Sequence, residues 1–190
     1  MDAPGLTVRP FRQITGSLEF AEVFFDDVRI PVDHRVGEEG DGWRIAMSTV
    51  AFERGPADVG YIADLQRNVQ ALIDRGRQGQ LGADPALLRR LARSYVDVQV
   101  LRAQVLRTVA RQVKGQASEA EVSVDKLLMV RAEQAFGHTT MDLLGAGPVA
   151  GTQPDALHQY LWSRAASVYG GSQEIQRTII ATRLLGLPRG

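Results

Sequence analysis

Polar side chains are concentrated in one short segment near the end of the chain, SVYGGSQEIQR, which spans residues 167–177. It surrounds a pair of glycines with a tyrosine, serines, glutamines, an acid and an arginine, so it can offer hydrogen-bond donors and acceptors to a ligand. Ser172 does not lie in the Gly-x-Ser-x-Gly turn of a nucleophilic serine, and the sequence places no histidine to activate it. We therefore expect no covalent intermediate at Ser172.

Other patterns that carry chemistry are missing from the sequence. The chain has no cysteine, which excludes disulfides, thiolate metal sites and a cysteine nucleophile. His34, His138 and His158 are far apart and lack metal-binding spacing such as HExxH, so we expect no metal site. The glycine-rich GEEGDGW (37–43) lacks the GK[ST] of a phosphate loop, and is better interpreted as the junction between a β-region and a helix.

The bulk composition is that of a soluble globular protein. Hydrophobic residues make up 44% and charged residues 23%, and the formal net charge is zero, so no overall field attracts nucleic acid or anionic lipid. No run approaches the length of a membrane span, and MDAPGLTVRPF lacks the charged-then-apolar pattern of a signal peptide. We expect a cytoplasmic protein with neither a nucleic-acid nor a membrane partner.

Basic residues dominate the segment from Asp84 to Lys114. They are Arg89, Arg90, Arg93, Arg102, Arg107, Arg111 and Lys114. Two interpretations stay open: a stripe that faces phosphate groups or an interface, and a solvated helix face opposite an apolar stripe. Like charges four residues apart cost little in water, which favours the solvated face.

The first part of the chain differs in character from the rest. β-branched and aromatic residues alternate with Pro and Gly breaks there, which predicts short strands over residues 6–9, 21–25 and 28–30. Two or three short strands do not form a stable sheet alone. We therefore predict that residues 1–38 are the end of a β-domain whose beginning lies outside this chain.

From Gly42 onward the apolar residues recur at steps of three and four, which is typical of helices. The pattern predicts helices over residues 41–74, 85–113, 118–144, 154–164 and 172–185. A kink or break is expected at Gly55-Pro56 in the first of them. Three long helices with short connections predict an antiparallel bundle. The expected fold class is therefore mainly α, with a helical bundle domain over residues 39–190 after the β remnant.

Three segments carry a resemblance to a known family. FAEVFFDDVRIP with VGEEGDGWRIAM, and later YGGSQEIQRTIIATRLLG, are similar to segments of the acyl-CoA dehydrogenase family. The resemblance covers nearly the whole chain and implies the last strands of the family's β-domain followed by its C-terminal four-helix bundle. It also implies an acyl-CoA substrate, FAD as cofactor, and a homo-oligomer or a hetero-oligomer with a related chain.

The resemblance offers two positions for the catalytic base. Many members carry a Glu after the Tyr of the C-terminal motif, where this chain has Gly170 after Tyr169, and glycine cannot take a proton. Isovaleryl-CoA dehydrogenase-like members carry Glu followed by Arg on the first long helix of the bundle, which matches Glu53 and Arg54 in STVAFERG. The resemblance thus implies Glu53 as the base for the α-proton, with Arg54, Tyr169 and Gly170 at the substrate. Desolvation beside the flavin would raise the pKa of the Glu53 carboxyl toward neutrality.

Contacts to FAD are implied at three places. Ser172 and Gln176 lie at the start of the last helix, where free backbone N–H groups suit an anionic flavin or phosphate group. In the family an Arg after the first long helix reaches a neighbouring subunit's FAD, and Arg75 or Arg77 could serve, although the family's following aromatic residue is missing here. Gly145, in LLGAGP, belongs to an altered form of the family's Gly-Gly-x-Gly segment.

Two other functions remain open. A non-catalytic helical subunit that assembles with a related flavoprotein chain would fit the incomplete β-region, because unpaired strand edges and an uncovered apolar bundle face favour association. A flavin-dependent oxygenase on the same fold would need no base, and would leave Glu53 without that role.

Overall fold

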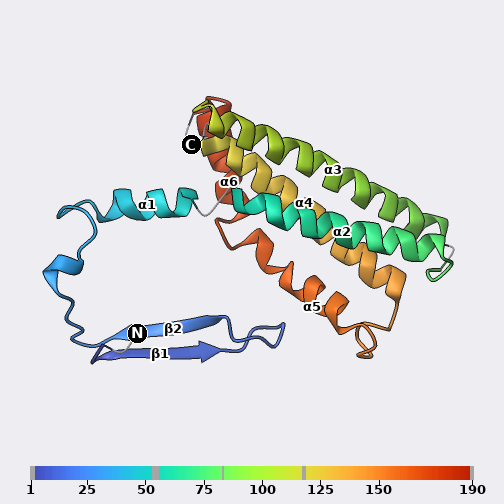
Figure 1. The fold of residues 1–190 in the computed structure, drawn as a ribbon, viewed down its shortest axis with the longest axis horizontal. Coiled ribbons are helices and arrows are strands. Elements are labelled where there is room, and N and C mark those ends of the chain that lie inside the picture. Colours follow the sequence, from blue (N-terminus) through green and yellow to red (C-terminus); the bar gives the residue numbers. More distant parts are fainter. Residues whose placement is uncertain (1–2, 53–55, 83, 117–118, 189–190) are drawn as a thin grey trace. The chain divides into compact units, whose positions relative to one another are not determined.

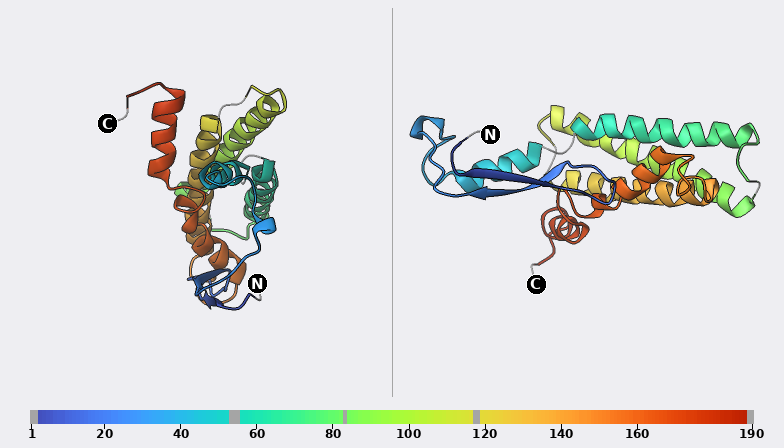
Figure 2. Two further views of the ribbon diagram at one scale, coloured as in Figure 1. Left: turned by 90° about the vertical axis from the view of Figure 1, so that its left-hand side faces the viewer. Right: turned by 90° about the horizontal axis from the view of Figure 1, so that it is seen from below.

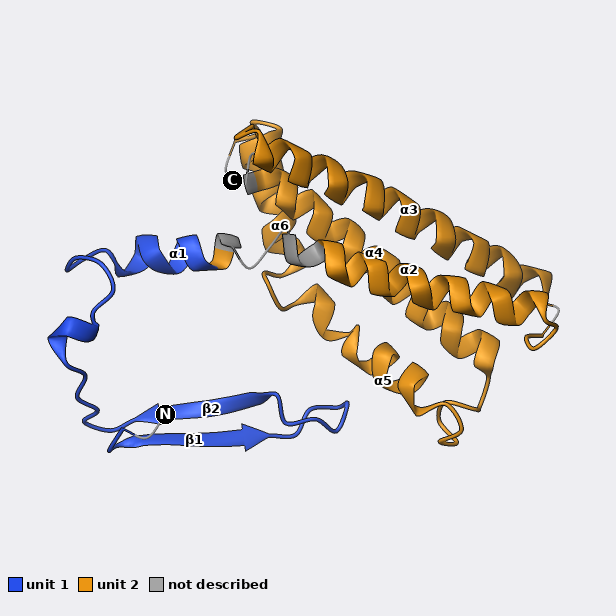
Figure 3. Cartoon of the chain, in the orientation of Figure 1, with its two compact units in different colours: residues 1–49 blue, residues 50–190 orange. Residues whose placement is uncertain are grey.

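The computed structural model describes residues 3–52, 56–82, 84–116 and 119–188. The chain divides into two compact units, residues 1–49 and residues 50–190 (Figure 3). In the part of the chain that the structure describes, no helix is both long and apolar enough to cross a bilayer.

The first unit contains a two-stranded antiparallel ribbon. β1 (Leu6–Phe11) pairs with β2 (Phe20–Phe25) in a register that places Phe11 opposite Phe20. The two rings stack with their centroids 6.3 Å apart, yet both remain about half exposed. Because two strands have no second layer to cover them, the ribbon leaves apolar surface open to solvent.

The strand predicted over residues 28–30 is wrong. These residues pair with no strand in the described part of the chain, and they lead into a short 3-10 turn, η1 (Val32–His34). The chain leaves the ribbon at Asp27, whose φ of +48° is one that Asp and Asn adopt more readily than other side chains.

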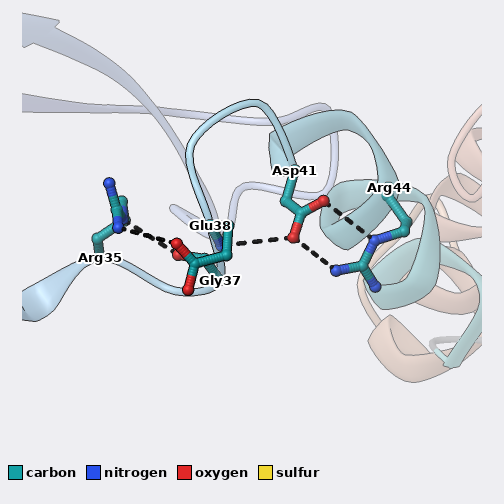
Figure 4. Close-up of polar contacts among 5 residues, drawn as sticks. All are labelled: Arg35, Gly37, Glu38, Asp41 and Arg44. Carbon is teal, nitrogen blue, oxygen red and sulfur yellow. Dashed lines mark hydrogen bonds and ion pairs between the residues drawn. The ribbon is translucent and has the colours of Figure 1, made fainter.

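A polar loop then leads into helix α1 (Gly42–Phe52) and is held by local ion pairs (Figure 4). Arg44 donates to the Asp41 carboxylate at 2.8 Å, and the Glu38 backbone N–H donates to the same carboxylate at 3.4 Å. The Arg44 guanidinium, and then the Glu38 N–H, lower the pKa of Asp41. Arg35 pairs with the Glu38 side chain at 3.4 Å. The start of α1 is therefore ordered by exposed polar contacts and not by burial.

Three long helices form the second unit: α2 (Pro56–Arg77), α3 (Pro85–Val113) and α4 (Glu119–Leu144). Each runs antiparallel to the next through a short connection, which confirms the predicted bundle and the mainly α class (Figures 1 and 2). Their facing sides enclose one apolar core, made of Ile62, Leu65, Val69, Leu72, Leu91, Val98, Leu101, Val105, Met129, Ala132, Phe136 and Leu143.

The helix expected over residues 41–74 consists of two helices, α1 and α2, in agreement with the break expected at Gly55-Pro56, of which Gly55 lies outside the described residues. α2 begins at Pro56, where the missing proline N–H needs no partner, and extends to Arg77, beyond the predicted end. After α4 come α5 (Pro154–Trp162) and a 3-10 turn, η2 (Ala165–Ser167). The last helix is α6 (Gln173–Ile179), which passes directly into a π-helical segment, η3 (Ile180–Leu184).

A side-chain cap begins α3. Asp84 Oδ1 accepts the backbone N–H of Ala86 at 2.8 Å, and so pairs one of the N–H groups that a helix start leaves unsatisfied. We expect Asp84→Ala to lower the free energy of unfolding by about 1 kcal/mol, measured by urea denaturation. Asp84→Asn keeps the acceptor and should cost much less. An equal loss in both variants would assign the effect to charge and not to the cap.

The side of α3 turned away from the core is not uniformly charged. Val96, Val100 and Leu106 are exposed there, and we call these three residues the outer α3 face. Arg90 and Arg111 are not simply solvated, because each pairs with an acidic side chain of α4, at 2.6 Å and 3.3 Å. Two of the basic residues of α3 therefore link it to α4 by ion pairs. The outer α3 face adds apolar surface to the solvent-exposed side of the helix.

Candidate functional site

The polar segment singled out in the sequence forms a tight turn before α6. Gly170 and Gly171 have φ values of +63° and +99°, which side chains rarely adopt. The fully buried Gln176 donates from Nε2 to the carbonyl oxygens of both glycines, at 3.2 Å and 3.3 Å. Ser172 caps α6, since its Oγ accepts the Ile175 N–H at 3.4 Å. The path of the backbone here depends on two glycines and one buried amide.

Lys126 of α4 lies against this turn. Its Nζ is 4.1 Å from the centroid of the Tyr169 ring, within the range of a cation–π contact. A Cβ built on Gly170 would lie 3.8 Å from the same Nζ. Lys126 is only 7% exposed, whereas Gly170 is exposed. A charged ammonium group therefore lies just beneath the surface of the turn.

A carboxyl group and a phenol extend this cluster toward α2. Glu133 follows Lys126 by two helical turns on α4 and accepts a hydrogen bond from Tyr61 of α2. Burial raises the pKa of Glu133, although the Tyr61 hydrogen bond and the charges of Lys126 and Arg164 act in the opposite direction. Burial, and next the charge on Glu133, raise the pKa of Tyr61, so the phenol keeps its proton. The pair is a phenol that donates to a buried carboxyl group.

Arg164 brings a second cation toward Glu133 and is itself held by several contacts. Its guanidinium donates to Ser163 Oγ at 2.7 Å and to His138 Nε2 at 3.0 Å, and lies 4.6 Å from the centroid of the Tyr160 ring. These contacts join the end of α5 to α4. Arg164 therefore acts on Glu133 by its charge from a fixed position.

Lys126, Glu133 and Tyr61 were not among the residues predicted for the site. Their positions on an apolar face of a predicted helix are the signal that could have identified Lys126 and Glu133. Lys126 and Glu133 are seven residues apart and share a face of α4 with the buried Val122 and Val130. Charged side chains on an apolar helix face are rarely fully buried without partners, so their presence there indicates a built polar cluster.

The predicted site residues separate into three groups. The turn brings together Tyr169, Gly170, Ser172 and Gln176. The C-terminal ends of α2 and α4, at the end of the bundle away from α6 (Figure 1), carry Arg75, Arg77 and Gly145. Arg77 pairs with Asp74 at 3.0 Å, and Gly145 has a φ of +60° where α4 ends. The third group, Glu53 and Arg54, lies outside the described residues.

The turn offers an acceptor that suits a ligand with a ring N–H. Gln176 Oε1 is buried and has no hydrogen-bond partner among the described residues, while its Nε2 is used by the turn. A buried acceptor left unpaired costs about 1–3 kcal/mol, so a ligand donor at this point would be stabilising. The isoalloxazine ring of a flavin carries such an N–H at its edge, and the residues present therefore fit FAD here. No group of acids and histidines that could hold a metal ion occurs in the described ranges.

Residues 40–185 match the family model described as acyl-CoA dehydrogenase, C-terminal domain, so the chain belongs to the acyl-CoA dehydrogenase family. It is 41% identical over 194 residues to acyl-CoA dehydrogenase IpdE1 of Mycobacterium tuberculosis, covering 100% of this chain and 49% of that relative. The chain thus spans about half the length of this curated relative.

Solved structures share the fold. One is the ChsE4-ChsE5 complex from Mycobacterium tuberculosis, with a TM-score of 0.80 and 24% identity over 100% of this chain and 52% of that chain. Another is PigA with FAD and proline, with a TM-score of 0.82 and 24% identity over 98% and 50% of the two chains. At this level of identity the likeness concerns the arrangement of the helices and strands.

Proposed function

We propose that this chain supplies the C-terminal part of an FAD-dependent acyl-CoA dehydrogenase, which forms a double bond between the α- and β-carbons of an acyl-CoA thioester. Membership of the family and the length relation to IpdE1 support the proposal. The observation that carries it is the turn from Tyr169 to Ser172, which is built from glycines and held by the buried Gln176 at the position of the family's C-terminal motif.

Glu53 is the proposed base, because Gly170 has no side chain that could take a proton. The carboxylate of Glu53 takes the α-proton, the β-hydrogen leaves with its electron pair, and the α,β double bond forms. FAD, when bound, supplies the acceptor for that hydride. Arg54 and Tyr169 border the acyl group, and the bare Gly170 leaves room for it.

The residues of this chain that are proposed to contact FAD lie at opposite ends of the bundle, so they would contact two different FAD molecules. Ser172 and Gln176 lie at one end of the bundle, and Arg75, Arg77 and Gly145 lie at the other. The 26 residues of α4 span about 39 Å, since an α-helix rises about 1.5 Å per residue. One chain therefore offers its two ends to two different FAD molecules, which favours an oligomer.

Retention of FAD by a glutamine variant tests the proposal. In the complete protein we expect Gln176→Ala to weaken FAD binding about tenfold, the effect of losing roughly one hydrogen bond in a buried site. Gln173→Ala is the matched control, because Gln173 lies on the same helix and accepts only a local bond from Arg177 at 2.9 Å. The flavin absorbance left after desalting at several FAD concentrations gives both affinities. Equal FAD affinity of the wild type and Gln176→Ala would exclude this contact between Gln176 and FAD.

A second candidate is a helical subunit that pairs with a related flavoprotein chain. The exposed outer α3 face and the exposed rings of the ribbon favour it, because such surfaces are usually covered by a partner. The solved ChsE4-ChsE5 structure is a complex, which supports pairing in this family by analogy. Size-exclusion chromatography with light scattering tests it. A clean, flavin-free monomer of this chain would count against both this subunit and an oligomeric enzyme.

A further inference from the structure

We propose that Lys126 is a positioning residue, which holds the Tyr169–Gly171 turn against the bundle and, through Glu133 and Tyr61, links that turn to α2. The link to catalysis rests on the proposed function. The placement of the turn is a property of this chain alone, and can be tested without turnover.

The turn has no regular secondary structure of its own, so side chains decide where it lies. Gln176 holds it from α6 by donating to the carbonyl oxygens of Gly170 and Gly171. Lys126 lies against it from α4, with Nζ 4.1 Å from the Tyr169 ring centroid. Two different helices thus contribute one buried polar side chain each to the same short segment.

Glu133 extends the contact from α4 to α2. Lys126 and Glu133 lie two turns apart on the same face of α4 and are both 7% exposed. The Tyr61 phenol acts as a hydrogen-bond donor to the Glu133 carboxyl group, whose Oε2 has no hydrogen-bond partner among the described residues. Tyr61 lies only eight residues after Glu53 in the sequence. The cluster therefore connects the C-terminal motif to α2, the helix that follows Glu53 in the sequence.

The charges in the cluster make the arrangement specific. A buried ammonium group costs free energy unless it has an aromatic face or a counter-charge nearby, and Lys126 has Tyr169 and Glu133. Removing one member of a buried charged group leaves the others uncompensated. The loss of the Lys126 charge should therefore loosen the turn and move Glu133 toward its neutral form.

Hydrogen exchange of the backbone amides measures the placement directly. In Lys126→Met we expect the amides of residues 169–172 to exchange at least tenfold faster, while the core amides of α3 keep their protection. Lys126→Arg keeps a cation and should restore most of the protection. Arg131→Met is the matched control, since Arg131 lies on the same helix, is largely exposed and pairs with Asp97 of α3 at 3.5 Å.

Two results would overturn the positioning role. One is unchanged exchange of residues 169–172 in Lys126→Met. The other is fast exchange of the turn amides in Lys126→Arg while the core amides remain protected. This second result is the decisive one if Lys126→Met unfolds. In the complete enzyme at saturating FAD, Lys126→Met should lower kcat and shift its pH profile. A loosened turn with unaltered kcat would keep the positioning role and reject its link to the reaction.

Discussion

Glu53→Gln is expected to lower the dehydrogenation rate of the complete enzyme by about 10²–10⁴-fold, the usual contribution of a general base. Glutamine has nearly the shape of glutamate but cannot take the α-proton. FAD should remain bound, because the residues proposed to hold it lie in other segments, so the flavin absorbance should be unchanged. Single-turnover reduction of the flavin by an acyl-CoA measures the step directly.

Asp64→Asn is the control for Glu53→Gln. Asp64 is also an acidic residue near the start of the bundle, but it is exposed and pairs with Arg67 within its own helix. Its neutralisation should leave flavin reduction within about twofold, since exposed pairs of this kind contribute little. If the flavin of Glu53→Gln is reduced at the wild-type rate, Glu53 is excluded as the base, and the oxygenase and subunit alternatives become open again.

Moving the carboxyl group to position 170 should not restore the enzyme. In Glu53→Gln/Gly170→Glu we expect recovery of less than about 10% of the lost rate. The positive φ of +63° strains any side chain at Gly170 by about 1–2 kcal/mol. The new Cβ would also lie 3.8 Å from Lys126 Nζ, and a nearby ammonium group lowers the pKa of a carboxyl. A carboxylate with a lowered pKa is a weaker base.

The pH dependence of the rate distinguishes the lowered pKa of the new carboxyl group from the backbone strain at position 170. A carboxyl with a lowered pKa stays ionised to lower pH, so the acid limb of kcat/KM should move below that of the wild type. Glu53→Gln/Gly170→Ala carries the backbone strain without a carboxyl group and should show only the residual rate of Glu53→Gln. Full recovery in the Gly170→Glu variant with a wild-type acid limb would mean that Lys126 does not act on this position.

The apolar periodicity was sufficient to locate the helices but not the centre of each buried face. On α3, Leu88 and Tyr95 share the apolar spacing of Leu91 and Val98, yet Leu88 and Tyr95 are 40% and 43% exposed whereas Leu91 and Val98 are buried. Leu101, at 0% exposed, is at the centre of the core. A helical pattern defines a face about 100° wide, and only the neighbouring helices determine which residues within it are covered.

The partners of the buried charges were beyond the reach of sequence reasoning for a related reason. A lysine or glutamate on a helix usually lies in water, because burial of a charge is costly. Lys126 and Glu133 are buried because Tyr61 and Tyr169, more than 30 residues distant in sequence, supply the aromatic face and the hydrogen bond that compensate them. No local pattern contains that information.

The sequence by itself determined the family, the mainly α class and the place of the C-terminal motif, because these depend on local residue types, spacing and helical period. Only the tertiary structure decided that Gly170 lies over a buried ammonium group, and that Gln176 uses its amide to hold the turn. The first depends on the packing of α4 against the turn, from which α5 separates it in the chain, and the second on the tight turn that brings Gln176 back onto the two glycines. Short-range residue preferences specify helices and strands. Which polar groups are buried, and which partners compensate them, depends on contacts between segments that are distant in the sequence.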